Sequence, residues 1–192
     1  MRVIAGKYKG RTLFSPKDQA VRPTTDRIKE NVFNLLQTRI PGCDFLDLFG
    51  GSGAMSIEAL SRGAAGAVLV DCDKESVKLI KKNLSALGIG REAELLETDY
   101  ARAAERLRGR SFDIIFLDPP YRADFYEDVL NKIASFSLLK EGGVAVFEHA
   151  TDRELSLPDG WRAADERKYG SVTISLLVFD FRSSIDKERQ KV

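Results

Sequence analysis

The sequence is poor in the residues that hold metals and disulfides. Its 192 residues include two cysteines, Cys43 and Cys72, and one histidine, His149. The cysteines are far apart and lack the spacing of metal ligands, so we interpret both as reduced, buried small residues and expect no metal site. His149 lies at the end of a predicted strand, and we assign it no catalytic role.

Long apolar runs are also missing. None approaches the ~20 residues that a helix needs to cross a bilayer, and the basic N-terminus has no apolar signal-peptide core. We therefore expect a cytoplasmic protein without a membrane partner. Hydrophobic residues make up 43% and charged residues 31% of the chain, a composition typical of one folded domain. No exposed apolar stripe stands out, which favours a monomer.

Net charge is only +1, but its distribution is uneven. The first 17 residues carry +5 and no acid, which leaves −4 for the rest of the chain. Such a segment is either a solvated terminus or an arm that contacts phosphates. Glycines and β-favouring residues predict a β-hairpin arm over residues 1–21. Its candidate RNA-binding side chains are Arg2, Lys7, Lys9 and Arg11.

Strand and helix patterns alternate through the rest of the chain. Helices are expected at 22–36, 53–63, 74–88, 101–109 and 125–136. Strands are expected at 44–49, 66–71, 93–98, 112–118 and 142–149, with an antiparallel pair at 160–170 and 171–181. This rhythm predicts an α/β fold with a doubly wound, mostly parallel, seven-stranded sheet. We assign residues 22–182 to this domain and residues 183–192 to a polar tail.

The loop after the first strand, "DLFGGSGAMSIEAL", is rich in glycine. Gly50, Gly51 and Gly53 permit a tight turn and let backbone N–H groups approach a ligand at a helix N-terminus. The second strand ends at Asp71, twenty residues past Gly51. At that distance an acidic side chain reaches the hydroxyls of a ribose.

The ligand predicted from this loop is S-adenosylmethionine rather than a dinucleotide. Ser56 stands where the dinucleotide fingerprint needs a third glycine, and Asp47 suits an ammonium group better than a pyrophosphate. Asp47 and the glycine turn match the amino-acid end of S-adenosylmethionine. Asp71 matches its ribose diol, and Asp99 matches its adenine amine. Each acid alone is typical of a helix cap or a loop. Three of them at the ends of three successive strands predict a methyl-donor site.

The stretch "FLDPPYR" ends the predicted fourth strand, which lies beside the first strand in such sheets. An exocyclic ring amine is a poor nucleophile because its lone pair is delocalised. Asp118 and the carbonyl of Pro119 are acceptors for its two N–H groups, and the prolines fix the backbone φ angle. Tyr121 is suited to stack on the base, which is worth about 1–3 kcal/mol. A strand-terminating turn is the alternative interpretation.

The segments "RPTTDRIKENVFNLL", "FLDLFGGSGAMSIEALSRGA", "FLDPPYR" and "KYGSVTISLLVF" together resemble the RsmD-type methyltransferases. This family has a Rossmann-like fold and uses S-adenosylmethionine to methylate the N2 amine of a guanine in 16S rRNA of the small ribosomal subunit. The resemblance covers the chain except its tail. One departure is Asp71, where relatives often carry glutamate; the shorter acid can still reach a diol.

The resemblance also implies residue roles. The active-site box is Asp118, Pro119, Pro120 and Tyr121. The cofactor contacts are Asp47, Phe49, Gly50, Gly51, Ser52, Gly53, Asp71, Cys72, Asp99, Tyr100 and Asp118. Arg22 and Thr24 lie at the mouth of the active site, and the basic arm faces 16S rRNA or an assembling small subunit.

Three alternatives share part of this pattern. Enzymes that methylate adenine N6 carry the same box, but they usually add a target-recognition segment for which this chain has no room. Enzymes that methylate glutamine amides normally have asparagine in place of Asp118 and have less use for a basic arm. A catalytically inactive RNA-binding scaffold has no need for the intact set of acids.

Overall fold

The computed structural model describes residues 1–15, 26–119, 125–152 and 155–181. Helices and strands alternate along most of this length. In chain order they are α1 (Asp26–Leu35), β1 (Asp44–Asp47), α2 (Ala54–Ser61), β2 (Gly66–Asp71), α3 (Lys74–Leu87), β3 (Ala93–Glu97), α4 (Tyr100–Arg106), β4 (Phe112–Leu117), α5 (Phe125–Ser135), β5 (Leu139–Ala150), β6 (Trp161–Tyr169) and β7 (Val172–Phe179). The predicted helices and the seven predicted strands of the sheet are all present, most with ends shifted by one to three residues.

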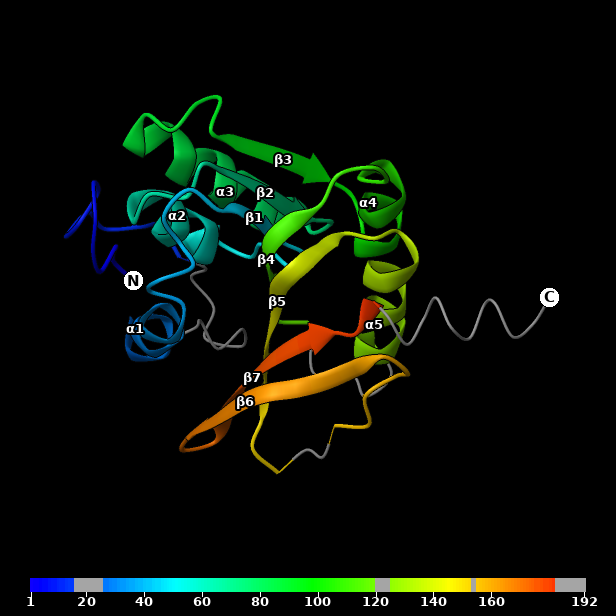
Figure 1. The fold of residues 1–192 in the computed structure, drawn as a ribbon. Coiled ribbons are helices and arrows are strands. Elements are labelled where there is room, and N and C mark those ends of the chain that lie inside the picture. Colours follow the sequence, from blue (N-terminus) through cyan, green and yellow to red (C-terminus); the bar gives the residue numbers. More distant parts are fainter. Residues whose placement is uncertain (16–25, 120–124, 153–154, 182–192) are drawn as a thin grey trace.

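The strands form one sheet in the order β3-β2-β1-β4-β5-β7-β6 (Figure 1). Strands β1 to β5 pair in parallel, and β7 runs antiparallel between β5 and β6. The chain therefore moves outward from β1 to β3 and then returns to place β4 on the other side of β1. This confirms the predicted doubly wound sheet and puts its switch point between β1 and β4, where ligands bind in such folds.

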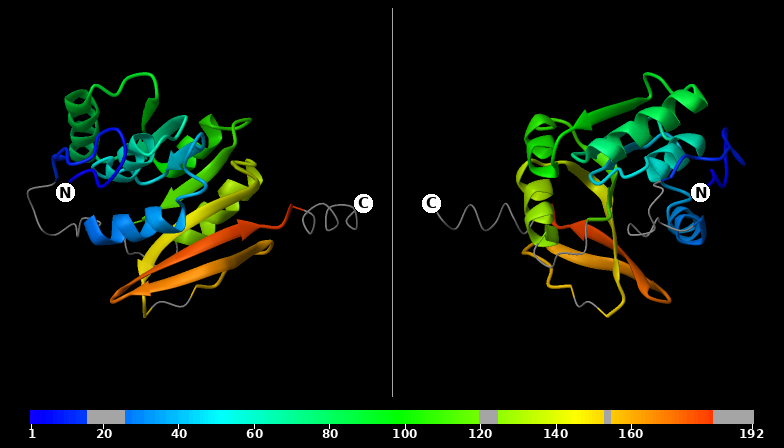
Figure 2. Two further views of the ribbon diagram at one scale, coloured as in Figure 1. Left: turned by 60° about the vertical axis from the view of Figure 1, so that its left-hand side comes forward. Right: turned by 180° about the vertical axis from the view of Figure 1, so that it is seen from behind.

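Helices cover both faces of the sheet (Figures 1 and 2). Alternate strand residues point to opposite faces, so each strand contributes to two cores. One core lies under α1, α2 and α3 and includes Phe33 and Phe45. The other lies under α4 and α5 and includes Leu130 and Phe147. The central parallel strands β1, β2 and β4 are buried on both sides, which explains their nearly continuous apolar sequences.

The N-terminal arm (residues 1–15) is less regular than the predicted hairpin. One antiparallel bridge joins Arg2 to Thr12, and no strand forms in the described part of the arm. Backbone hydrogen bonds such as Val3 N–H to the Arg11 carbonyl link the two halves of the arm, but the N–H groups of Ile4 and Ala5 bond to α2 instead of extending this ladder. Its two apolar anchors, Val3 and Leu13, are 1% and 3% exposed and belong to the core under α1 to α3. The arm is thus packed onto the domain.

Glu58 of α2 holds the start of the arm. Its carboxylate is fully buried and accepts hydrogen bonds from the backbone N–H groups of Ile4 (2.8 Å) and Ala5 (3.0 Å). The buried Lys29 ammonium lies 3.3 Å from the same carboxylate, and the Arg62 guanidinium lies 2.7 Å away. Burial lowers the pKa of Lys29, and the charge of Glu58 opposes this shift.

Some details differ from the sequence-based expectations. Cys43 is buried as expected, but Cys72 is exposed, because it lies just after β2 in the loop that leads to α3. Strand β5 begins three residues earlier than predicted, and His149 near its end is 7% exposed. Residues 16–25, which include Arg22 and Thr24, and the predicted tail lie outside the described residues. No helix among the described residues is long and apolar enough to span a membrane.

We predict that Glu58→Ala lowers the free energy of unfolding by about 3–5 kcal/mol, because it leaves the buried Lys29 charge without its counter-ion. Urea unfolding measures this loss. Adding Lys29→Met to the variant should recover part of the stability. The exposed pair Glu75–Lys78 supplies a control, since Glu75→Ala should change stability by at most ~1 kcal/mol. Equal losses in the two single variants would contradict the buried-pair argument.

Candidate active site

Asp47 ends β1 inside the protein. Its side chain is 1% exposed, and its register partner on β4 is Phe116, two residues before Asp118. The Ser56 hydroxyl donates a hydrogen bond to the Asp47 carboxylate (3.1 Å), and the Phe49 N–H lies 3.4 Å from its other oxygen. Neither partner carries a charge, so the carboxylate has polar neighbours but no counter-ion there.

The glycine loop (residues 48–53) connects Asp47 to α2. Gly51 and Gly53 have φ angles of +55° and +78°, a region that side chains with a Cβ rarely adopt. A Cβ at Gly50 would lie 3.0 Å from the Ile80 side chain, so this position also needs its hydrogen. The glycines therefore let the loop turn sharply while it packs against α3.

Asp71, at the end of β2, contacts the glycine loop directly. One carboxylate oxygen accepts the Gly51 N–H at 2.8 Å, and the other accepts the Asp73 N–H at 2.8 Å. The twenty-residue spacing seen in the sequence is thus a hydrogen bond in the structure. An ionised carboxylate has about four acceptor positions, so Asp71 keeps capacity for two hydroxyl donors.

Asp47, Asp71 and Asp118 share an electrostatic property. Burial raises the pKa of Asp47 to about 7 and that of Asp118 to about 6, and it also raises the pKa of Asp71. The charges of Asp118 and Asp71 raise the pKa of Asp47 further. Within the described ranges, no lysine or arginine forms an ion pair with any of them. The site is therefore suited to a ligand that carries positive charge.

Comparison with known proteins places the chain in a family. The model of the family described as "Conserved hypothetical protein 95" matches residues 1–178. Ribosomal RNA small subunit methyltransferase D of Escherichia coli (strain K12) is 34% identical over 92% of this chain and 88% of its own length. The chain belongs to the RsmD-type methyltransferase family. The protein YlbH of Bacillus subtilis is 42% identical over 83% of this chain and 86% of its own length.

Solved structures agree with this placement. The methyltransferase yhhF of Escherichia coli superposes with a TM-score of 0.83 at 31% identity, covering 94% of this chain and 98% of that one. A more distant structure, SMU.776 complexed with SAH, has a TM-score of 0.64 at 20% identity and shows the shared fold. It covers 78% of this chain and 48% of that one.

The third acid predicted in this RsmD-type site, Asp99, has a visible structural role. Its exposed side chain caps α4 by accepting the Arg102 N–H at 3.0 Å, and this bond lowers its pKa. The next residue, Tyr100, donates its hydroxyl to Asp128 at 2.7 Å, and burial raises its pKa to about 12. Its ring lies 5.7 Å from that of Phe49. Phe49 and Tyr100 thus form an aromatic pair beside the glycine loop.

The remaining predicted site residues fall in two groups. Pro119 directly follows Asp118 at the end of β4, whereas Pro120 and Tyr121 lie outside the described residues. Lys7, Lys9 and Arg11 are exposed, but the Lys7 N–H bonds to the Ser61 carbonyl at the far end of α2. An eight-residue helix is about 12 Å long, so the basic tip of the arm and the glycine loop lie at opposite ends of α2.

Sequence reasoning missed three residues that organise the site. In the sequence, Ser56 indicates only that the third glycine of the dinucleotide fingerprint is missing. In the structure, its hydroxyl donates a hydrogen bond to Asp47. Asp73 caps α3 by accepting the Ser76 N–H at 2.8 Å. An aspartate directly before a helical pattern is the sequence signal that indicates such a cap. Asn83 of α3 bonds to the glycine loop, and nothing in the sequence separates it from surface asparagines.

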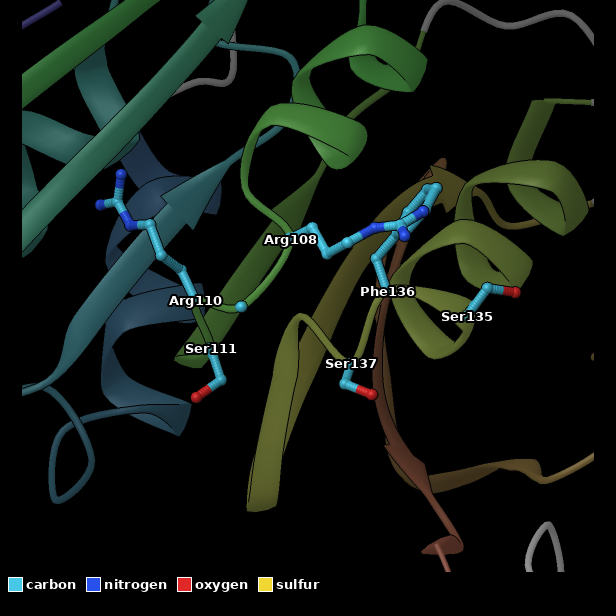
Figure 3. A pocket seen from close by; sticks show the side chains of 7 residues that line it. Arg108, Arg110, Ser111, Ser135, Phe136 and Ser137 are labelled. Carbon is cyan, nitrogen blue, oxygen red and sulfur yellow. The ribbon is translucent and has the colours of Figure 1, made fainter.

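A surface hollow of about 460 Å³ lies away from the candidate site (Figure 3). It adjoins Ser111, just before β4, whereas Asp118 follows that strand. Six strand residues span about 20 Å. The guanidinium of Arg108 lies over the Phe136 ring, and Arg110 points away to pair with Glu94 at 2.7 Å. The described residues contain no cluster of His, Cys, Asp and Glu able to hold a metal.

The raised pKa of Asp47 predicts a pH-dependent cost to stability. A carboxyl with a pKa near 7 when folded and an ordinary value of 3.8 when unfolded stabilises the fold below about pH 4 and loses that contribution as pH rises through 7. In urea unfolding at pH 8, the free energy of unfolding of Asp47→Asn should therefore exceed that of the wild type by up to ~4 kcal/mol. At pH 4 the two free energies should be similar.

A matched control for this prediction is Asp73→Asn. Hydrogen bonds at the start of α3 lower the pKa of Asp73, so this variant should show no gain at pH 8. A difference between Asp47→Asn and the wild type that stays constant from pH 4 to 8 would contradict the argument.

Proposed function

We propose that this protein transfers a methyl group from S-adenosylmethionine to the exocyclic N2 amine of a guanine in 16S rRNA of the small ribosomal subunit. The observation that carries the proposal is the placement of Asp47 and Asp118. Both are acids of raised pKa at the carboxyl ends of neighbouring strands, at the switch point of the sheet.

The residues at this edge fit S-adenosylmethionine, which supplies a methyl group made electrophilic by a positively charged sulfur. Asp47 and the N–H groups of the glycine loop suit its ammonium and carboxylate. Asp71 suits the ribose diol, and the Phe49–Tyr100 pair suits the flat adenine. The uncompensated acids favour this cationic donor over a nucleotide that carries phosphates, which they would repel.

Asp118 and Pro119 would act on the amine. The carboxylate of Asp118 and the carbonyl of Pro119 accept its two N–H groups, which favours a more tetrahedral nitrogen with an available lone pair. With a pKa of about 6, Asp118 is mostly ionised at pH 7 and above. The nitrogen would become cationic as its bond to the methyl carbon forms and the carbon–sulfur bond of the donor breaks, which leaves neutral S-adenosylhomocysteine. The nitrogen would then lose a proton to solvent. Alignment of the reacting atoms can lower the barrier by roughly 7–11 kcal/mol.

The RNA substrate is supported by two observations. The E. coli relative is named a ribosomal RNA small subunit methyltransferase, and this chain covers most of its length. The exposed basic side chains of the arm offer contacts to phosphates. The guanine N2 amine is proposed from the resemblance of the sequence motifs to the RsmD family.

The direct test uses small ribosomal subunits from a strain that lacks this protein and a donor with a labelled methyl group. We expect one labelled nucleotide in 16S rRNA, identified as N2-methylguanosine by mass spectrometry of the digest. Label in N6-methyladenosine, or in a protein glutamine, would replace this proposal with one of the alternatives. Failure to bind the donor in calorimetry would favour the inactive scaffold.

We predict that Asp118→Ala reduces turnover at least 100-fold, because it removes one acceptor for the amine. Its affinity for S-adenosylmethionine, measured by calorimetry, should stay within a few-fold of the wild type. Asp113→Ala is the control on the same strand: it breaks contacts with Lys140 at the other end of β4 and should lower stability rather than kcat. Near-normal turnover of Asp118→Ala would contradict the mechanism.

We also predict that neutralising Lys7, Lys9 and Arg11 together weakens RNA binding and flattens its salt dependence. Each lost phosphate contact changes the slope of log K against log salt by about 0.7–0.9. Binding measured between 50 and 200 mM salt should therefore lose up to ~2–3 from its slope. The matched control neutralises Lys132, Arg162 and Lys168, away from the arm, and should keep the wild-type slope. An unchanged slope in the arm variant would remove the arm from the RNA interface.

A further inference from the structure

Asn83 of α3 joins the N-terminal arm to the glycine loop. Its side chain is 1% exposed and makes three hydrogen bonds. The amide oxygen accepts the Phe14 N–H at 2.8 Å. The amide nitrogen donates to the Phe14 carbonyl at 3.0 Å and to the Ser52 carbonyl at 2.8 Å. One buried side chain thus holds two segments that are 38 positions apart in the sequence.

The orientation of this amide is set by its partners. Two of them are carbonyls, which require the NH₂ group, and the third is an N–H group, which requires the oxygen. A flipped amide would lose all three bonds. Because the side chain is buried, each lost bond would leave a polar group without water to replace it.

Asn83 contacts the loop at a sensitive place. Ser52 lies between Gly51, whose N–H bonds to Asp71, and Gly53, which precedes α2. Ile80, one turn earlier on the same face of α3, packs against Gly50 of this loop. A shift of Asn83 would therefore be transmitted to the part of the loop proposed to bind the methyl donor.

Glu58 and Ser61, which also hold the arm, do not bond to the glycine loop in this way. Glu58 binds Ile4 and Ala5, and the Ser61 hydroxyl accepts the Tyr8 N–H at 2.9 Å and donates to the Ala5 carbonyl at 2.5 Å. Both belong to α2, and their hydrogen bonds go to the arm and to neighbouring helix residues. In the described structure, Asn83 is the residue whose side chain hydrogen-bonds to both the arm and the glycine loop.

We propose that Asn83 is a positioning residue that couples RNA binding by the arm to donor binding by the glycine loop. This inference rests on the proposed function, since it takes the arm to bind RNA and the loop to bind S-adenosylmethionine. A ligand that orders one segment also fixes the Asn83 amide, and so lowers the entropic cost of ordering the other segment. By thermodynamic linkage each ligand then raises the affinity of the other by the same factor.

The first experiment measures this factor with S-adenosylhomocysteine, which permits binding without turnover. Calorimetry gives its Kd with and without saturating small subunits that lack the methyl group. We expect the RNA to tighten binding at least about 5-fold in the wild type. In Asn83→Ala the ratio should fall to near 1. In the control Ser61→Ala, which loosens the arm away from the loop, the ratio should persist.

The second experiment needs no RNA, and its decisive comparison uses the wild type alone. Hydrogen–deuterium exchange of the amides of residues 11–15 is followed with and without S-adenosylhomocysteine. We expect the ligand to slow exchange in the wild type and in Ser61→Ala but not in Asn83→Ala. An unchanged exchange rate in the wild type would overturn the coupling, even if Asn83→Ala failed to fold.

The outcomes separate this inference from the proposed function. Wild-type protein that binds both ligands with a ratio of 1 overturns the coupling and leaves the proposed function standing. Wild-type protein that binds S-adenosylhomocysteine but no RNA contradicts the proposed function, and the exchange measurement then decides whether Asn83 couples the arm to the loop.

Discussion

The burial of the Asp47 carboxyl is the constraint on which the site depends. The end of β1 is covered by the glycine loop and α2, so this acid has left water without gaining a cation from the described part of the chain. A buried charge without a counter-ion is costly, and the protein responds by raising the pKa of the acid. The site is thus electrostatically incomplete by itself. A positively charged ligand would complete it, and the same burial that destabilises the fold would then favour binding.

The acids of the site could be predicted from the sequence because of where they stand in it. Asp47, Asp71 and Asp118 each end or directly follow an apolar run, and parallel strands bring such ends to one edge of the sheet. The partners across the fold could not be predicted in this way. Ser56, Glu58 and Asn83 are polar residues of helices, and the sequence does not show which of them a neighbouring segment will bury.

The arm illustrates the same limit. Gly6 and Gly10 have the positive φ angles that a hairpin favours, and the predicted turn is real. Tertiary contacts explain why the hairpin is incomplete. Glu58 and Ser61 accept hydrogen bonds from backbone N–H groups of the arm, which therefore do not pair with a second strand. A Cβ at Gly6 would lie 1.8 Å from the Ser61 carbonyl, so close approach to α2 explains this glycine as well as the turn does.

The distance between the arm and the chemistry also bears on the substrate. The basic tip of the arm meets Ser61 at one end of α2, and the glycine loop meets the other end, about 12 Å along the helix axis. A single nucleotide or a glutamine side chain is too short to contact both ends together. A folded RNA can place a phosphate at the tip while an unpaired base enters the active site. A substrate that contacts both the arm and the active site is therefore a macromolecule, as the proposed rRNA is, rather than a small molecule.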